Sequence, residues 1–283
     1  MPVIAMTQEM GSLAKDVALK LASALDIEVM RNEVVDHVSA KMALPKSAVR
    51  RLREGKAGFL ERLKTDRKIM ALYTAEEVFE LANRGNVVLR GWGATCLLRP
   101  VPHVPCVRIT SSFEKRVEWL MSSLETEDRD FAASEIRRSD EAHASRMHQQ
   151  FGVSWGDPVL YDMVLNTDRV SVDSCVEQII LLSRRPEFQE TEESRAVLAN
   201  MTLEARIHAA IKDNAATRDT HITVEARNGE VALLGIVLDA QERARTEQVV
   251  TEVPGVAGVD NQLRLMTSQK QFMSAKHHIP RDA

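Results

Sequence analysis

The sequence predicts two folded units: an α/β unit whose parallel sheet is flanked by helices, and a smaller α+β unit after it. Three observations predict this division. Over roughly the first 185 residues, short apolar runs alternate with longer helical patterns, as βα units require. The stretch from Glu187 to Arg195 then carries four glutamates, which is typical of a polar linker. Beyond it, the pattern changes to helix, strand, strand, helix, strand.

These changes of pattern set the expected boundaries. Pro186 marks the end of the first domain, because proline cannot continue a helix and restrains the residue before it. We expect a first domain at residues 1–186, an acidic linker at 187–201, a second domain at 202–267 and a disordered polar tail at 268–283.

Each element of the first domain follows from its periodicity. Apolar runs of strand length lie at 3–6, 87–89, 106–109 and 163–166. Patterns of helical period lie at 13–25, 31–42, 46–53, 66–84, 112–123, 130–150 and 172–183. Ser171 and Asp173 are N-terminal signals for the last of these helices. Apolar strands separated by helices in this way indicate a parallel sheet.

The second domain has the predicted order αββαβ. Leu203, Ile207 and Ile211 repeat every four residues and predict a helix over 203–212. A strand at 221–226, an Asn-Gly hairpin turn at 228–229 and a second strand at 230–238 are expected next. A helix at 239–252 and a last strand at 259–265 complete the domain.

Composition and charge bound the function. The chain has 283 residues, 44% of them apolar, and a net charge of −4, which gives no general attraction to nucleic acid. It contains neither an apolar run of 18 residues nor a basic start followed by an apolar core, so we expect no transmembrane segment and no export. Cys96, Cys106 and Cys175 are scattered without metal-ligand spacing. We therefore expect free thiols in the cytoplasm and no metal site.

The N-terminus holds a strand, a glycine-containing turn and a helix, which is the frame of phosphate-binding P-loops. The amides of such a turn and the helix N-terminus favour an anion. Aligned to G-x-x-x-x-G-K-[ST], residues 9–16 keep only the lysine, Lys15, in register. Two interpretations remain open. Either Ser12, the nearby backbone amides and Lys15 bind an anion, or Ser12 caps the following helix and Lys15 is simply exposed.

Four stretches give the chain a resemblance to a known family. They are the N-terminal turn with residues 17–25, the run 87–94, the strand and helix at 107–117, and the stretch from Asp140 to Thr167. In order and spacing they resemble the cytidylate kinase-like family, a branch of the P-loop nucleoside monophosphate kinases, over roughly residues 1–185. The resemblance implies a P-loop kinase-like fold with a site for ATP and Mg²⁺.

The chain departs from the family's pattern within the implied site. Leu13 and Ala14 replace glycines of the phosphate loop. Trp92, between Gly91 and Gly93, replaces an arginine that would meet the phosphate of the acceptor. Trp92 could stack on a base or plug the vacant pocket, and we favour the plug because large aromatic side chains tend to pack.

Charged positions differ as well. Arg31 stands where the family tends to be acidic, and His143 stands where an arginine of the lid helix is expected. Arg116 matches the family, and Arg137 and Arg146 are close enough in sequence to substitute in part. If the chain is active, the resemblance implies catalysis by Lys15, Arg116, Arg137 and Arg146, nucleotide binding by Gly11, Ser12, Lys15 and Asp16, and an acceptor pocket at Arg31, Gly91, Trp92 and Gly93.

Residues 46–68 hold nine Lys or Arg residues against three acids. In this fold class the stretch lies on the acceptor side, where it could attract nucleotides or an anionic surface. The alternative that we favour is a solvated helical face.

The C-terminal domain resembles a BON domain. The run Leu234-Gly235-Ile236-Val237 and the pattern from Gly255 to Leu263 carry this resemblance, which covers about residues 200–267. BON domains are noncatalytic modules associated with phospholipid surfaces, small ligands or protein partners. The resemblance therefore implies a protein or phospholipid partner.

Three functions remain open. We favour a degenerate kinase-like protein that responds to a nucleotide or anion and engages a partner or membrane surface through the BON domain. The alternatives are an active ATP-dependent kinase of CMP or dCMP, and a noncatalytic scaffold that self-assembles as a homo-oligomer. Activity requires an open pocket beside Lys15 reached by at least two arginines. Regulation predicts a pocket without that charge set, and scaffolding predicts a pocket filled by Trp92 and Leu13.

Overall fold

The computed structural model describes residues 2–30, 32–54, 56–58 and 66–266. The chain divides into two compact units, one ending at Ala205 and the other beginning at Arg206. Two sequence expectations, the acceptor-side role of Arg31 and the disordered tail at 268–283, lie outside the described residues.

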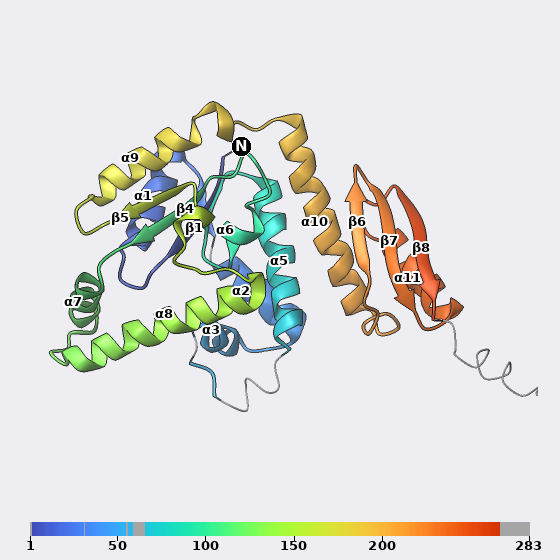
Figure 1. Cartoon of the computed structure of the whole chain (residues 1–283), viewed down its shortest axis with the longest axis horizontal. Coiled ribbons are helices and arrows are strands. Elements are labelled where there is room, and N and C mark those ends of the chain that lie inside the picture. The colour runs from blue at the N-terminus through green and yellow to red at the C-terminus, as the bar shows by residue number, and fades with distance from the viewer. Residues whose placement is uncertain (1, 31, 55, 59–65, 267–283) are drawn as a thin grey trace, which may run out of the picture. The chain divides into compact units, whose positions relative to one another are not determined.

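Five parallel strands form the sheet of the first unit (Figure 1). They are β1 (Val3–Gln8), β2 (Glu28–Met30), β3 (Val87–Arg90), β4 (Cys106–Thr110) and β5 (Met163–Asn166), in the spatial order β2-β3-β1-β4-β5. In the central strand, Ile4 pairs with Val88 on one side and Ala5 with Cys106 on the other. The predicted parallel sheet is confirmed. Because all strands run in the same direction, their carboxyl ends meet at one edge, where α/β proteins bind ligands.

Helices flank this sheet. They are α1 (Ala14–Leu25), α2 (Asn32–Met42), α3 (Lys46–Glu54), α5 (Arg67–Arg84), α6 (Ala94–Leu97), α7 (Phe113–Leu124), α8 (Arg129–Phe151) and α9 (Val172–Ser183). The helices α1 and α9 pack against each other over the sheet, where Val17, Leu21 and Ile179 join Ile4 and Val107 in a fully buried core. Each side chain of this kind stabilises the fold by about 1.5–3 kcal/mol when buried.

Two short elements lie outside the sequence expectations. β2 is only three residues long, pairs with β3 alone, and has half-exposed or exposed side chains. α6 is a four-residue helix after β3. Elements this short bury too few apolar side chains to give a periodic signal in the sequence.

The structure differs from the linker expected at residues 187–201. Helix α10 runs from Glu192 to Asp213, well before the helix expected at 203–212. Thr191 and Ser194 cap its start reciprocally. The amide of Thr191 donates to Ser194 Oγ at 2.9 Å, and the amide of Ser194 donates to Thr191 Oγ1 at 3.1 Å.

One face of the first half of α10 belongs to the first unit. Ser194 Oγ lies 2.8 Å from His103 Nδ1, and Thr202 Oγ1 donates to the carbonyl oxygen of Phe79 at 3.4 Å. Leu198, between these two positions, is only 3% exposed. Residues buried at every fourth position explain why this segment is a packed helix although its glutamates suggest a linker.

The second unit holds a three-stranded sheet and one further helix. β6 (Thr223–Arg227) and β7 (Glu230–Val237) form an antiparallel hairpin, and α11 (Ala240–Thr251) leads to β8 (Gly258–Leu265), which is parallel to β7. Asn228 and Gly229 have φ values of +52° and +89°, as a two-residue turn of type I′ demands. With the end of α10, these elements confirm the predicted order αββαβ.

Among the described helices, none combines the length and the apolar character that a membrane crossing would need.

Leu198→Ala tests whether the start of α10 is part of the fold. Truncating this buried side chain leaves a cavity, so we expect the free energy of unfolding of the first unit to fall by about 2–4 kcal/mol. Leu181→Ala on α9 is the matched control, because Leu181 is 56% exposed. Denaturant unfolding of the full chain measures both variants. If both variants lower the free energy of unfolding by the same small amount, residues 192–201 behave as a solvated linker.

Candidate functional site

The loop between β1 and α1 turns at two residues in the left-handed backbone region. Gly11 has a φ of +82° and Leu13 a φ of +56°. The Ser12 hydroxyl donates to the carbonyl oxygen of Glu9 at 2.8 Å and closes the turn. Leu13 occupies the N-cap position without a side-chain cap, and the helix begins at Ala14. The interpretation of Ser12 as a helix cap is therefore wrong.

Several donors of this loop have no acceptor in the protein. Within the described residues, the backbone N–H groups of Gly11, Leu13, Ala14 and Lys15 make no hydrogen bond. The exposed Lys15 side chain likewise forms no ion pair with any residue that the structure describes. The start of a helix leaves such donors to water or a ligand and carries the positive end of the helix dipole. The loop can therefore accept an anion.

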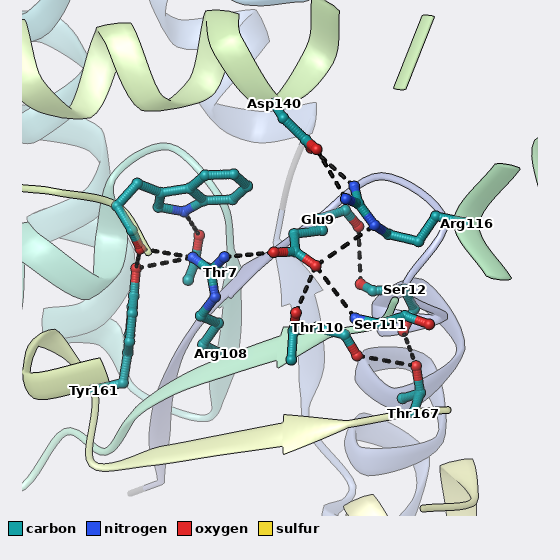
Figure 2. A network of polar contacts seen from close by, with 11 residues as sticks. Thr7, Glu9, Ser12, Arg108, Thr110, Ser111, Arg116, Asp140, Tyr161 and Thr167 are labelled. Atoms are coloured by element: carbon teal, nitrogen blue, oxygen red, sulfur yellow. Dashed lines mark hydrogen bonds and ion pairs between the residues drawn. The ribbon is translucent and has the colours of Figure 1, made fainter. Parts of the chain in front are cut away.

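Figure 2 shows the buried network that holds the start of this loop. Glu9 accepts at Oε1 from Arg108 Nη2 at 2.6 Å, and at Oε2 from the Thr110 hydroxyl at 2.5 Å and the Ser111 amide at 3.2 Å. Arg116 Nε lies 3.6 Å from the same Oε2. The side chains of both arginines are only 7% exposed, so these contacts act at a low dielectric constant. The protein itself therefore neutralises the charge of Glu9.

Arg116 also joins α7 to α8. Its Nη1 and Nη2 each donate to one carboxylate oxygen of Asp140 at 2.9 Å, in the fork geometry that arginine favours (Figure 2). A Cβ built on Gly11 would lie 3.1 Å from backbone atoms of Arg116, and the φ of +82° favours glycine, so a side chain here would strain the turn and require a small shift of α7. The donors of Arg116 are thus directed at Glu9 and Asp140, and its observed contacts are structural.

A cavity of about 410 Å³ lies between this loop, the end of β3 and the helices α3, α7 and α8. Its lining comprises residues 8–16 together with Arg53, Arg90, Gly91, Trp119, Ser139, His143 and Arg146. Of the predicted site residues that the structure describes, Gly11, Ser12, Lys15, Asp16, Gly91 and Arg146 line this cavity, whereas Trp92, Gly93, Arg116 and Arg137 do not. Arg137 is exposed, with its guanidinium 4.8 Å from the centre of the Phe113 ring.

The structure corrects the expectation that Trp92 plugs the pocket. The indole lies outside the cavity lining, and the Arg53 guanidinium stacks on it at 4.1 Å from the ring centre. At this distance the positive charge is attracted to the electron-rich face of the indole. The cavity stays open, and an arginine from α3 reaches it.

Two residues of α8 set the electrostatics of the facing wall. The pKa of His143 is lowered to about 3, first by burial and then by the nearby charges of Arg146 and Arg53. The neutral His143 ring stacks on Trp155 at 4.3 Å between ring centres. Burial also lowers the pKa of Arg146 to about 10, with Arg67 as the second cause. At neutral pH, Arg146 therefore carries a charge and His143 does not.

Sequence reasoning missed the roles of Arg53 and Arg90. Arg90 is the last residue of β3, at the carboxyl edge of the sheet, and its Nη1 donates to Gln8 Oε1 at 2.9 Å. The sequence does contain a signal for Arg90, which is a charged residue at the end of a buried strand, because parallel sheets bind ligands at that edge. Arg53 belongs to the basic stretch 46–68, where nothing in the sequence distinguishes it from its neighbours.

The donor set fits a phosphate group. Lys15, Arg53, Arg90 and Arg146 supply positive charge, and the loop supplies unpaired amides. Within the described part of the chain, no group of three or more His, Cys, Asp or Glu side chains could hold a metal ion alone. A magnesium ion fits here only with phosphate oxygens among its ligands and Asp16 beside it.

Asp140→Asn tests the contact that joins α7 to α8. The change leaves the buried Arg116 guanidinium partly unpaired, so we expect the free energy of unfolding to fall by about 1–3 kcal/mol. Glu114→Gln is the matched control, because its ion pair with Arg129 is exposed and should contribute under about 1 kcal/mol. Denaturant unfolding measures both variants. If both lose a similar amount of free energy of unfolding, the structural role of Arg116 is contradicted.

His143 predicts a dependence of stability on pH. Its folded pKa of about 3 lies below the value of about 6.5 in unfolded chains. Between these values the unfolded chain binds a proton that the folded chain does not. The free energy of unfolding should therefore fall on acidification below about pH 6.5, by up to about 1.4 kcal/mol per pH unit from this residue.

His143→Gln removes that contribution while keeping a planar polar side chain. Urea unfolding between pH 4 and 7 should give a shallower pH dependence for the variant than for the wild type. Parallel curves would mean that His143 titrates normally in the folded chain.

Comparison with known proteins identifies the relatives of both units. The profile of the cytidylate kinase-like family matches residues 3–169, and that of the BON domain matches residues 200–267. A cytidylate kinase from Pyrobaculum neutrophilum is 26% identical over 177 residues, which are 62% of this chain and 89% of the relative.

Solved structures also match part of the chain. An uncharacterized protein from Eubacterium ventriosum gives a TM-score of 0.52 at 20% identity, covering 65% of this chain and all of that one. Shikimate kinase from Bacteroides thetaiotaomicron gives a TM-score of 0.38 at 17% identity, and the match covers 64% of this chain and 97% of that one. Since the first family match spans more than half of the sequence, the chain belongs to the cytidylate kinase-like family and carries a BON domain in its C-terminal part.

Proposed function

We propose that the kinase-like domain binds the phosphate groups of a nucleotide in the cavity at the carboxyl edge of its sheet. The observation that carries this proposal is the loop from Gly11 to Lys15, whose amides have no acceptor within the described residues and whose lysine forms no ion pair there. Unpaired amides at a helix start, next to a lysine, favour an anion with several oxygen acceptors.

The charge balance of the cavity supports an anionic ligand. Lys15, Arg53, Arg90 and Arg146 line it together with two acids. One of the acids, Glu9, is neutralised by the two arginines behind it. Lys15 and Arg146 alone therefore outweigh Asp16, and a polyphosphate would gain more here than a neutral metabolite.

ATP with Mg²⁺ is the cofactor that we propose for this site. Lys15 and the loop amides would hold the phosphates, and Asp16 would lie beside the ion or a water bound to it. Bound in this way, the ion would spread the negative charge of the phosphates. The residues of this chain would bind, orient and shield the ligand.

We propose that the chain acts as a nucleotide-responsive regulatory protein, with a site too altered for fast transfer. Leu13 lines the cavity where the family's phosphate loop has glycine, and its side chain is 36% exposed there. His143 stands in the place of an arginine and stays neutral. Losing one cation that stabilises a transferring phosphoryl group slows such reactions by about 10³-fold or more.

A second candidate is an active kinase of CMP or dCMP. The observation that favours it is the set of three arginines, Arg53, Arg90 and Arg146, that line the cavity beside Lys15. This set meets the condition for activity derived from the sequence, so the regulatory proposal rests on Leu13 and the neutral His143 and not on a lack of arginines. The related cytidylate kinase of Pyrobaculum neutrophilum agrees with this candidate. The scaffold hypothesis is less well supported, because it requires the cavity to be filled.

For the second unit we propose the role expected of a BON domain, which is to engage a protein partner or a phospholipid surface. The chain's net charge of −4 gives no support to a nucleic-acid partner. The free thiols of Cys96, Cys106 and Cys175 favour a location in the cytoplasm.

Calorimetric titration with ATP·Mg²⁺ tests the proposal. We expect Lys15→Ala to weaken ATP binding by about tenfold or more, because it removes a charged contact to phosphate. Lys20→Ala is the matched control, since Lys20 lies on the same helix but pairs with Asp173 away from the cavity. If the wild-type chain does not bind ATP, or if both variants bind it equally well, the proposal is wrong.

A coupled assay with CMP and dCMP then separates the two candidates. The regulatory proposal expects ATP binding without appreciable turnover of either monophosphate. Turnover that depends on Lys15, at rates of about 1 s⁻¹ or more, would establish the active kinase instead.

A further inference from the structure

We infer that Trp119 is the stacking platform for the base of the nucleotide, so that the cavity selects a phosphate that carries a flat ring over a bare polyphosphate. This inference rests on the proposed function, because it adds a contact to the ligand whose phosphates Lys15 and the loop amides would hold. The ligand class is a nucleoside polyphosphate, bound at one end through its charge and at the other through the face of its base.

Trp119 differs from the two other tryptophans in having no partner for its ring. The Trp92 ring faces the Arg53 guanidinium at 4.1 Å, and the Trp155 ring lies 4.3 Å from that of His143. In the part of the chain that the structure describes, the Trp119 ring stacks on no other ring or cation, and its indole N–H makes no hydrogen bond. Trp119 is 39% exposed and lines the cavity. It therefore offers a ligand both an aromatic face and a donor.

Helix α7 fixes Trp119 beside the phosphate-binding loop. Trp119 follows Arg116 by three residues, so the two side chains are neighbours on the helix surface. At Arg116 the loop and the helix meet, because Gly11 approaches the backbone there and Met10 packs against the apolar cluster between α7 and α8. The indole of Trp119 therefore belongs to the next turn of α7 after this meeting point.

The platform is held in place before any ligand arrives. Arg116 binds Asp140 of α8 through two hydrogen bonds and lies 3.6 Å from Glu9 of the loop. These contacts restrain the helix that carries Trp119, and less conformational freedom is then lost when a ligand binds.

The lining of the cavity has an apolar part as well as a cationic part. Met10, Leu13 and Trp119 contribute apolar surface to it, and Leu13 is 36% exposed. Lys15 and Arg146 contribute charges that form no ion pair within the described residues. A ligand that uses both parts carries phosphate groups at one end and a flat apolar group at the other. A base has such a face, and its stacking on an aromatic side chain strengthens binding by about tenfold or more.

The size of the cavity also favours a small ligand as the group that covers Trp119. Its volume of about 410 Å³ lies in the range of pockets that bind metabolites and cofactors. A large aromatic side chain that stays exposed to water forgoes the gain from burial. A base stacked on Trp119 would remove part of its surface from water, whereas a bare polyphosphate would leave it exposed.

The test is calorimetric titration of the full chain with ATP and with tripolyphosphate, which keeps the phosphates and lacks the base. Both ligands are used with Mg²⁺. We expect the wild type to bind ATP at least about tenfold more tightly than tripolyphosphate, and Trp119→Ala to lose most of this difference. Leu124→Ala is the matched control, because Leu124 lies on the same helix and is 50% exposed but does not line the cavity. It should bind both ligands as the wild type does.

Two further variants ask whether the flat ring is what matters. Trp119→Phe keeps an aromatic face and should bind ATP within about threefold of the wild type. Trp119→Leu is apolar but not flat, and it should bind ATP almost as weakly as Trp119→Ala. Unfolding midpoints identify any variant that fails to fold, and Trp119→Phe and Trp119→Leu carry the test if Trp119→Ala does not fold.

Stacking also has a spectroscopic signature, because a base stacked on an indole quenches its fluorescence. ATP should lower the tryptophan emission of the wild type, and tripolyphosphate should not. Trp119→Phe should still bind ATP but without this loss of emission.

The outcomes separate this inference from the proposed function. If ATP binding depends on Lys15 but the wild type binds tripolyphosphate as tightly as ATP, this inference is overturned and the proposed function stands. The same holds if Trp119→Ala, once folded, binds ATP as the wild type does, or if Trp119→Phe is as weak as Trp119→Leu. If the wild type binds neither ATP nor tripolyphosphate, the proposed function itself fails.

Discussion

The carboxylate of Glu9 is the contact on which the site depends. It stands at the first position of the altered phosphate loop, where a glycine would leave the backbone free to turn. Instead, Arg108, Thr110, Ser111 and Arg116 fix its two oxygens at the wall of the cavity. Because Arg116 also binds Asp140, one buried ionic network joins the loop, β4, α7 and α8. Such networks are costly to bury, and in this one Arg116 Nε, 3.6 Å from Glu9 Oε2, makes no hydrogen bond within the described residues.

This network explains how the cavity keeps a positive character after so many changes from the family's pattern. Arg108 and Arg116 are directed at Glu9, and the cations that line the cavity come from other residues. Lys15 arrives from α1, Arg146 from α8, and Arg90 and Arg53 from β3 and α3. The cations have been redistributed around the cavity rather than lost. An unusual motif on one loop therefore says little about the electrostatics of the finished site.

Much of the fold could be predicted, because it follows from local patterns. The apolar strands, the helices between them and the Asn228-Gly229 hairpin each leave a periodic or conformational signal. The start of α10 could not, because its glutamates are exposed and two of its three buried residues, Ser194 and Thr202, are polar, which leaves Leu198 as the apolar one. In the site, Lys15 was found by its position in the motif, and Arg146 by its nearness in sequence to a motif position that holds His143. Arg53 depends on a contact with Trp92 that joins residues far apart in sequence, and no single segment contains that information.

The stacked pair of His143 and Trp155 has a consequence for how the cavity senses its surroundings. A histidine with an ordinary pKa would gain charge on mild acidification and change the field around any bound anion. Here the imidazole stays neutral down to about pH 3, and Arg146 stays charged up to about pH 10. This wall of the cavity therefore presents a constant potential across the physiological range. Any change in its attraction for a phosphomonoester near pH 6 would come from the ligand's own second ionisation.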